Sequence, residues 1–148
     1  MRCPPSPWKE VFNHDKKIYI THCSAKKDDS FRGIKRKVTP ERLYTAIPLQ
    51  RFVKRCKEKG VDWAIFSDKY GVVFPDNKIE WYNKHPSKVT PDEFKTLVNH
   101  FVQQLSRYDE IWFYHNPGRF HPLYKKLVDE ARKRGLNVKL FTHLSEIR

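Results

Sequence analysis

The sequence predicts an α/β protein: a three-layer sandwich in which helices cover both faces of a four-stranded, mostly parallel sheet. Strand-like apolar segments alternate along the chain with amphipathic segments of helical period. Such alternation forms right-handed strand–helix–strand units, which place the strands side by side in parallel. With 148 residues, 39% of them hydrophobic, the chain is long enough for one core and too short for two, so residues 1–148 are expected to form a single domain.

The chain begins with a Pro-rich stretch that predicts a flexible arm over residues 1–14. The first strand is expected at 17–21, Lys-Ile-Tyr-Ile-Thr, where β-branched and aromatic residues prevail. A polar, basic segment at 28–39 then shows neither a helical nor a strand period, which indicates a mobile loop.

The first helical region is expected after Thr39 and Pro40, a cap residue followed by a proline at the first helical position. Its main helix spans 48–58 and ends before Gly60. Apolar residues recur along this helix at spacings of three and four, which predicts a core-facing stripe and a structural role for its cysteine; the stripe consists of Leu49, Phe52, Val53 and Cys56.

The remaining elements continue the alternation. Residues 61–66 are expected to form a second buried strand, and 67–89 a long loop. Thr90, Pro91 and Glu93 combine an N-cap, a proline at the first helical position and a carboxylate near the positive end of the helix dipole, which indicates the start of a second long helix. The later elements are a third strand at 110–114, a third helix at 122–134 and a fourth strand at 137–142.

The charge of the chain predicts a polyanionic partner. Thirty Lys and Arg residues against seventeen Asp and Glu give a formal charge of +13. Ion-pair networks of heat-loving proteins also use many charged residues, but they need roughly balanced signs, and here the excess is one-sided. Aromatic residues make up 14% of the chain and offer stacking surfaces for exposed bases, although most are expected in the core. Nucleic acid, either tRNA or DNA, is therefore the expected partner.

The sequence also indicates a compartment. It contains no apolar run of about 18 residues and no apolar centre near its N-terminus, so neither a membrane span nor a signal peptide is predicted. Its three cysteines, Cys3, Cys23 and Cys56, include no Cys-x-x-Cys pair, which argues against a disulfide framework and a four-ligand structural zinc. Reduced thiols fit a cytoplasmic protein that has no membrane partner.

Polar residues follow every predicted strand at the point where it ends. In a parallel sheet these carboxyl ends share one edge, and ligands bind outside that edge where the strand order reverses. Loops are polar in most proteins, so an ordinary surface loop is the alternative for each segment. The predicted site is assembled from segments 22–27, 67–71 and 115–121 and from His143.

Cys23 has the sharpest chemistry of these residues. His22, Lys26 and Lys27 flank it, and nearby positive charge favours the thiolate, which is either a nucleophile or, together with His22, a metal ligand. The alternative is a small, partly buried residue at a strand end. Lys26 and Lys27 are expected to hold a phosphate, and a desolvated lysine of this pair can also act as a nucleophilic amine.

The segment after the second strand brings a hydroxyl, a carboxylate, an ammonium and a phenol together before Gly71, which permits a sharp turn. Asp68 can orient a water or a ribose hydroxyl. Ser67 and Lys69 are expected to bind phosphate, and Tyr70 to stack on a base. An ordinary turn with a surface ion pair is the alternative for this segment.

The segment after the third strand adds two candidate catalytic residues. His115 offers an imidazole for acid–base chemistry, and Asn116 an amide that reads a base edge or positions a water. Arg119 and, in the 28–39 segment, Arg36 are expected to contact phosphates. A polar loop punctuated by Pro and Gly is the alternative. The tripeptide His85-Pro86-Ser87 is similar to a uracil-glycosylase signature, but it stands before a helix instead of after a late strand.

Two enzyme classes are excluded by missing motifs, and no cofactor is assigned. With only five glycines the chain has no Gly-rich phosphate loop of a nucleotide triphosphatase or a dinucleotide-dependent dehydrogenase. It also lacks the His-x-Glu and Pro-Cys-x-x-Cys arrangement of the zinc deaminases.

Three short motifs resemble a little-characterised family of small microbial and viral proteins, over about residues 17–145. They are Cys23-Ser24-Ala25-Lys26-Lys27 after the first strand, Leu43-Tyr44-Thr45 before a helix, and Phe66-Ser67-Asp68-Lys69-Tyr70-Gly71-Val72-Val73 after the second strand. That family is in turn similar to the uracil-DNA-glycosylase-like domain of archaeosine synthase and, more distantly, to the peroxide-stress protein YaaA.

The synthase motif Pro-Cys-x-x-x-Lys-Pro-Tyr is matched here at Cys23 and Lys27, whereas His22 replaces its first Pro and Asp28-Asp29 replaces its Pro-Tyr. This departure argues against the synthase reaction itself. The resemblance implies a three-layer, uracil-DNA-glycosylase-like α/β fold and a nucleic-acid base as the ligand. The positions that carry the match are Cys23, Lys27, Ser67 and Lys69.

Together these observations predict an enzyme that acts on a nucleic-acid base, by modifying a base in tRNA or by excising a damaged base from DNA. A non-catalytic nucleic-acid-binding module of the same fold is one alternative. A thiol or redox sensor built on Cys23, with a depressed thiol pKa, is another. The predicted catalytic residues are Cys23, Lys27, Asp68, His115 and Asn116, and the predicted nucleic-acid and phosphate contacts are Lys26, Ser67, Lys69, Tyr70, Arg119 and Arg36.

Overall fold

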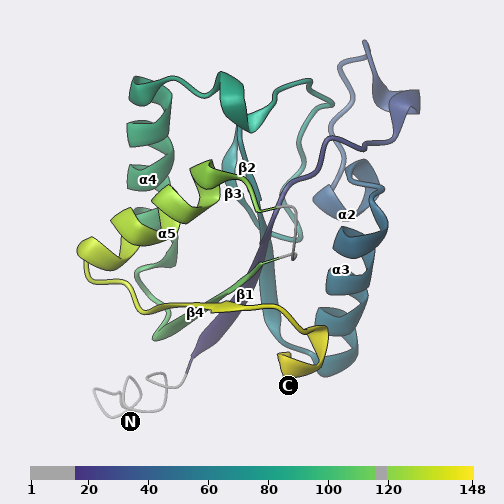
Figure 1. The fold of residues 1–148 in the computed structure, drawn as a ribbon. Coiled ribbons are helices and arrows are strands. Elements are labelled where there is room, and N and C mark those ends of the chain that lie inside the picture. Colours follow the sequence, from purple (N-terminus) through teal and green to yellow (C-terminus); the bar gives the residue numbers. More distant parts are fainter. Residues whose placement is uncertain (1–15, 116–119) are drawn as a thin grey trace, which may run out of the picture.

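The computed structural model describes residues 16–115 and 120–148, and its centre is a five-stranded sheet (Figure 1). In chain order the strands are β1 (Lys17–His22), β2 (Asp62–Ser67), β3 (Gly71–Val73), β4 (Glu110–Tyr114) and β5 (Val138–Phe141). They lie in the order β3-β2-β1-β4-β5, and all neighbours run parallel except β3, which is antiparallel to β2. The predicted α/β class with a mostly parallel sheet is confirmed.

The predicted number of four strands is wrong. β3 lies inside the stretch 67–89, for which the sequence predicts a continuous loop. Gly71, at a φ of 77°, reverses the chain after β2, so that Val72 pairs with Phe66. Three residues at a sheet edge are too few to show an alternating pattern, which is why this strand escapes prediction.

Helices cover both faces of the sheet and complete three layers (Figure 1). The α-helices of the described residues are α2 (Pro40–Leu43), α3 (Ile47–Lys59), α4 (Pro91–Leu105) and α5 (Pro122–Lys133). α2 and α3 lie on one face, and α4 and α5 on the other. Short 3-10 helices occupy η1 (Asp29–Phe31), η2 (Pro86–Lys88) and η3 (Leu144–Glu146).

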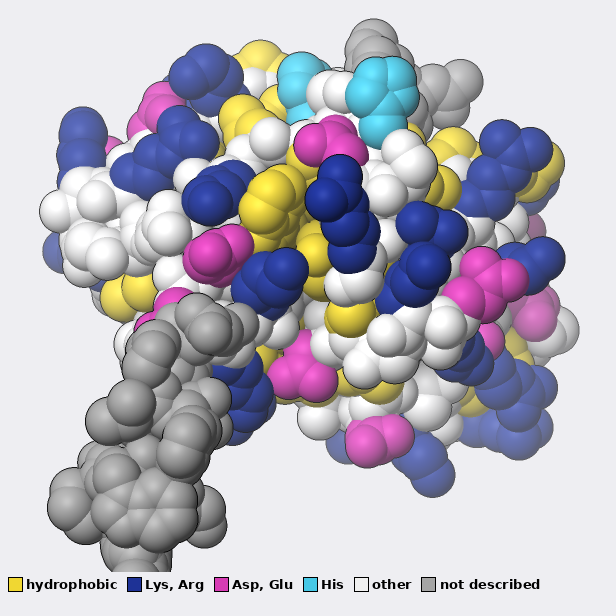
Figure 2. Space-filling view, turned by 90° about the horizontal axis from the view of Figure 1, so that it is seen from below, with side chains coloured by type: hydrophobic (Ala, Val, Ile, Leu, Met, Phe, Trp, Pro, Cys, Tyr) yellow, Lys and Arg dark blue, Asp and Glu magenta, His cyan; other side chains and the backbone are white. Residues whose placement is uncertain are grey.

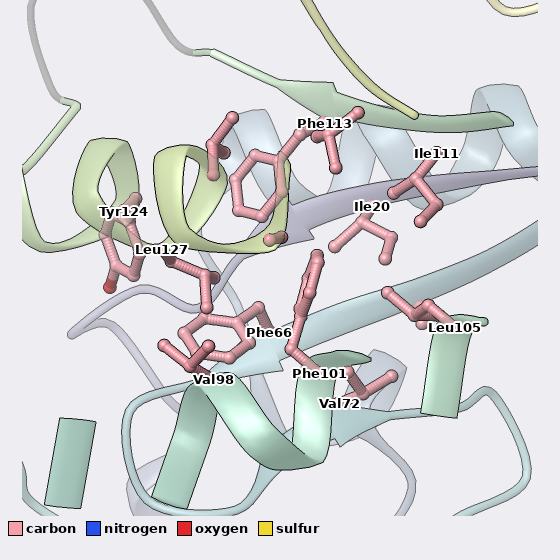
Figure 3. Close-up of a cluster of buried hydrophobic side chains, with 14 of the residues drawn as sticks. Ile20, Phe66, Val72, Val98, Phe101, Leu105, Ile111, Phe113, Tyr124 and Leu127 are labelled. Carbon is pink, nitrogen blue, oxygen red and sulfur yellow. The ribbon is translucent and has the colours of Figure 1, made fainter. Parts of the chain in front are cut away.

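Side chains of successive strand residues point to two cores, one on each face of the sheet. Ile20 and Phe66 belong to the core beneath α4 and α5, where Phe66 meets Phe101 edge-on at 5.8 Å between ring centroids (Figure 3). Tyr19 and Ile65 belong to the core beneath α3. The alternation fixes which residues remain at the strand ends, beyond both cores.

The helix boundaries follow the signals in the sequence. Thr90 caps α4 by accepting a hydrogen bond from the Glu93 amide, and the Glu93 carboxylate accepts one from the Thr90 amide. Gly60, at a φ of 64°, ends α3. The predicted stripe of α3 is buried, which confirms the structural role of Cys56; its members are Leu49, Phe52, Val53 and Cys56.

The segment 28–39 is pinned to the rest of the fold, although its sequence lacks a period. Val38 and Ile79 exchange two backbone hydrogen bonds of 2.8 Å, and the side chains of Phe31 and Val38 are buried. The predicted arm at 1–14 lies outside the described residues. Among the residues that are described, no helix combines the length and apolar character needed to cross a bilayer.

The connections place a crevice at the carboxyl ends of β1 and β4. After β1 the chain moves to α2 and α3 on one face, and after β4 it moves to α5 on the opposite face. Two neighbouring parallel strands whose connections leave in opposite directions form the switch point at which α/β proteins bind ligands.

Candidate functional site

A cavity of about 300 Å³ lies at this carboxyl edge. Its walls come from the end of β1, the turn after β2, the start of η2 and the first turn of α5. Four segments that are distant in sequence therefore meet at one place. The lining residues are His22, Cys23, Ser24, Ala25, Asp68, Lys84, His85, Pro86, His121 and Tyr124.

Asp68 is the buried carboxyl of this cavity, with only 2% of its surface exposed. The Tyr124 hydroxyl donates to its Oδ1 at 2.9 Å, and the Cys23 thiol donates to its Oδ2 at 3.4 Å. Burial raises the pKa of Asp68, while these two donors and the charge of Lys27 act in the opposite direction. The result is a carboxyl whose orientation is fixed by neutral donors.

Cys23 is buried, and its thiol is protonated in this environment. Burial raises the pKa of the thiol to about 12, and the charge of Asp68 adds to that rise. The predicted thiolate is therefore wrong, and so is the depressed thiol pKa expected for a redox sensor. The flanking cations have less effect than predicted because Lys26 points to solvent and burial lowers the pKa of His22.

Lys27 turns inward, unlike its neighbour Lys26. Its backbone pairs with Tyr44, and its ammonium lies 4.4 Å from the ring centroid of Tyr82 and 5.8 Å from that of Tyr44. Only 9% of the residue is exposed, and burial lowers its pKa, against the opposing charges of Cys23, Asp68 and Asp29. Lys27 thus supplies a buried cation next to the carboxyl, and Lys26 is left outside the cavity.

Three imidazoles line the cavity. The ring of His22 stacks on Tyr124 at 4.5 Å between centroids and donates from Nδ1 to the Cys23 carbonyl at 2.8 Å. His85 and His121 each accept a backbone amide hydrogen at Nδ1, as N-caps of η2 and α5, so a neutral ring carries its proton on Nε2. These two rings lie 5.8 Å apart and offer two donors to a ligand.

Ser67 has a different role from the one predicted. It is fully buried, its hydroxyl donates to Tyr82 at 2.8 Å, and it accepts the backbone amides of Lys69 and Tyr70 at 3.1 and 3.0 Å. A hydroxyl enclosed in this way cannot reach a phosphate, so that prediction is wrong. Tyr70 packs edge-on against Tyr82 at 5.4 Å and does not line the cavity as a stacking platform.

The other predicted residues lie around the cavity. His115 packs against Phe120, 4.3 Å between centroids, and is not itself one of the lining residues. Lys69 is exposed and borders two neighbouring hollows. Arg36 is exposed, with its guanidinium 5.6 Å from the ring of Phe31. Asn116 and Arg119 lie outside the described residues.

The residues that the sequence did not single out come from distant segments. Tyr124 lies one turn after His121 on α5, and Tyr82 and Lys84 belong to the irregular stretch after β3. No local pattern marks these positions. A weak signal existed for His85, in the tripeptide similar to a glycosylase signature, and its unusual place in the chain order hid its closeness to Cys23.

Charge and metal-binding potential complete the description. Figure 2 shows Lys and Arg side chains across the lower end of the molecule in Figure 1, where β1 begins, with Asp and Glu side chains between them. Positive charge is therefore found at the end of the molecule opposite the carboxyl edge of the sheet. Within the part of the chain that the structure describes, no three His, Cys, Asp or Glu residues are arranged to hold a metal ion.

Comparison with known proteins adds a family and no activity. The model of a family of unknown function (DUF6884) matches residues 18–140, which include all the residues that line the cavity and every strand except the first residue of β1 and the last residue of β5. No curated protein and no solved structure matches the chain.

Proposed function

The chain belongs to this family of unknown function, DUF6884, and we propose that it binds a nucleic-acid base in the cavity beside Asp68 and acts on that base. One observation carries the proposal: a buried carboxyl lines the cavity while the Tyr124 hydroxyl and the Cys23 thiol each hold one of its oxygens. General acid–base catalysis needs a carboxyl that is fixed in this manner and has an altered pKa.

The cavity suits a flat, polar ring. Its volume of about 300 Å³ is at the lower end of the range of small-ligand pockets. Imidazole and phenol rings line it, and the Nε2 groups of His85 and His121 are donors for the carbonyl oxygens or ring nitrogens of a base. A base of this kind reaches such a pocket after it leaves the stack of its strand.

Hydrolytic excision of the base is the reaction that needs the fewest components beyond the residues of the cavity. In this reaction the Asp68 carboxylate takes a proton from water, and the water oxygen bonds to C1′ of the sugar. The bond from C1′ to the base nitrogen breaks, and the base leaves with its electron pair. Hydrogen bonds from His85 and His121 stabilise the departing anion, which solvent then protonates. Modification of the base in tRNA would use the same carboxyl but needs a second substrate.

Cys23 and Tyr124 are positioning residues in this proposal, because they act through Asp68. A thiol with a pKa of about 12 is a hydrogen-bond donor and a poor nucleophile at neutral pH. Lys27 adds positive charge next to the carboxyl and favours its ionised form. The predicted catalytic set is thereby reduced, among the described residues, to one acid–base group and its supports.

Two further features support a nucleic-acid substrate. The formal charge of +13 supplies affinity for a phosphate backbone. The sequence motifs resemble a family of small microbial and viral proteins that is in turn similar to the uracil-DNA-glycosylase-like domain of archaeosine synthase, and two of the four positions that carry the match, Cys23 and Lys27, lie next to Asp68. A uracil-DNA-glycosylase-like architecture is part of the proposal.

A non-catalytic base-binding module is the second candidate. The observation that favours it is the protonated state of the Cys23 thiol, which removes the strongest nucleophile that the sequence offered. In such a module Asp68 would hold the base by hydrogen bonding alone.

The deciding experiment measures free bases and nucleosides by mass spectrometry after incubation with tRNA and with oligonucleotides that contain uracil or other damaged bases. Asp68→Asn removes the acid–base group, and Asp76→Asn makes the same chemical change at an exposed position. We expect a base to be released or altered by the wild type and by Asp76→Asn but not by Asp68→Asn. If the wild type changes no base yet still binds these substrates, the binding module is the correct function.

A further inference from the structure

We propose that a second hollow, next to the site cavity, binds the backbone of the single-stranded nucleic acid that flanks the base; this inference rests on the proposed function. The hollow has a volume of about 610 Å³ and lies between residues 33–35 and residues 80–84. Lys84 borders both this hollow and the site cavity, so the two are neighbours across one side chain. A strand whose base enters the cavity can continue along the hollow.

A smaller hollow of about 250 Å³ shares lining residues with both. It is bordered by Asp68, which also lines the site cavity, and by Lys69, which also lines the second hollow. The carboxyl proposed for chemistry and the lysine proposed for backbone contact are therefore consecutive residues that face neighbouring spaces. The three spaces are neighbours that share lining residues, and Asp92 and Glu93 also border the smallest one, which directs an anionic strand towards the second hollow.

The charges along the second hollow favour an anionic backbone. Lys35 and Lys69 are exposed, and neither takes part in any salt bridge among the described residues. Lys84 is neutralised by Glu93 at 2.8 Å, which leaves Glu80 as the unpaired acid of the lining. Two free ammonium groups against one carboxylate give a net attraction for phosphates.

An aromatic wall accompanies these cations. Trp81 lines the hollow, and the guanidinium of Arg32 lies 5.2 Å from its ring centroid. Ile34, of which 48% is exposed, lies on the opposite side. Alternating cations and apolar surfaces are typical of grooves that follow a single strand, because sugars and bases contact the apolar parts while phosphates meet the cations.

The hollow exists before any ligand arrives. Its two sides are held together by the Val38–Ile79 pair, and Phe31 anchors the adjacent turn in the core. A preformed groove spends little free energy on ordering its own backbone when a strand binds. Single-stranded nucleic acid fits this hollow because the same strand must present an unstacked base to the cavity.

The test compares two double variants. Lys35→Ala/Lys69→Ala removes the two free cations of the hollow, and Lys54→Ala/Lys59→Ala removes two exposed lysines of α3 that line neither the cavity nor either hollow. Fluorescence anisotropy measures the binding of nine-nucleotide DNA and RNA strands at several salt concentrations. Base release per bound strand and binding of the free base are measured in parallel.

We expect Lys35→Ala/Lys69→Ala to weaken strand binding about tenfold at low salt and to reduce the salt slope by about 1.4, the value for two phosphate contacts on a single strand. Binding of the free base should be unchanged. Equal effects of the two double variants would overturn the inference. A wild type that alters no base, combined with the expected loss of slope, would reject the proposed chemistry and retain the strand-binding hollow, so the two failures are distinguishable.

Discussion

Two cysteines are buried among the residues that the structure describes. Both thiols are protonated, but the residues that surround them differ. Cys56 is fully buried on α3 among apolar side chains, and Cys23 is buried at the end of β1 beside Asp68 and Tyr124. Burial raises the pKa of both thiols to about 12. Burial thus keeps both thiols protonated. Only Cys23 has polar neighbours, and these allow its thiol to support a functional site.

The surroundings of Cys23 and Cys56 differ in hydrogen bonding. Cys56 takes part in packing, and among the described residues its sulfur has no hydrogen-bond partner. Cys23 donates to a carboxylate that has few other ways to satisfy its oxygens. Variants at the two positions therefore make a matched pair, in which similar loss of packing has different consequences for chemistry.

The largest expected effect distinguishes the surroundings of Cys23 from those of Cys56. Asp68→Asn removes the acid–base group beside Cys23, and we expect base release to fall by about 1,000-fold, within the usual range for such a group. Cys56→Ala should retain activity, because Cys56 does not line the cavity. Rates of base release under single-turnover conditions measure both. A comparable loss in both variants would show that stability and not chemistry controls the rate.

The reactivity of the two thiols tests the protonated state that Cys23 and Cys56 share. With a pKa raised from 9.0 to about 12, each thiol has a thiolate fraction about 1,000-fold below that of a free cysteine at pH 8. In a Cys3→Ser background we expect neither position to react quickly with a disulfide reagent until the protein unfolds. Rapid modification of Cys23 in the folded protein would contradict its protonated state and revive the redox-sensor hypothesis.

A smaller effect tests the positioning role of Cys23. Because its thiol lowers the pKa of Asp68, Cys23→Ala should raise that pKa, move the acid limb of the pH–rate profile to higher pH and slow base release about tenfold. Cys23→Ser keeps a donor and should restore most of the rate and the profile. Cys56→Ala should leave the profile unchanged and cost about 1 kcal/mol of stability. An unchanged profile in Cys23→Ala would reject the positioning role.

The smallest expected effect concerns stability. Burial raises the pKa of Asp68 in the folded protein, so the folded state binds its proton more tightly than the unfolded state does. The stability that this carboxyl contributes is present below its unfolded pKa and is lost as the pH rises through its folded pKa. Asp68→Asn should therefore be more stable than the wild type at pH 7, by about 1 kcal/mol, and lose this advantage towards pH 4. Chemical denaturation at both pH values measures the difference, and a less stable variant at pH 7 would contradict it.

The sequence predicts the elements whose signals are local. The capping residues at Thr90, the glycine at the end of α3 and the five residues of β4 each appear where the pattern indicates. β3 is missed because its three residues form a strand only by pairing with β2, and the local sequence does not reveal that pairing. Periodicity in the sequence is therefore enough to predict the fold class. The edge strand β3 can be predicted only when its tertiary pairing is known.

The site divides in the same way. The chain order of a parallel sheet correctly indicates that Cys23 and Asp68 lie at one edge, although they are 45 positions apart. The direction of each side chain does not follow from the sequence: Lys26 and Lys27 are neighbours, yet one is exposed and the other buried. Tyr124 joins the site through tertiary contacts that leave no local pattern, and the tripeptide that contains His85 gives no sign that this residue lies close to Cys23.

The reversal at Gly71 has a consequence for how such a protein can diversify. β3 runs back along β2 from the carboxyl edge, and the chain then returns to that edge, where residues 81–86 form walls of the cavity and of the neighbouring hollow without belonging to the sheet. Substitutions in this stretch alter the shape of the binding site while the carboxyl and its two donors stay in place directly after β2, directly after β1 and on α5. Most of the recognition surface is thereby encoded apart from the carboxyl and its donors, and exchanging this stretch with His85 retained would retarget the protein without rebuilding its core.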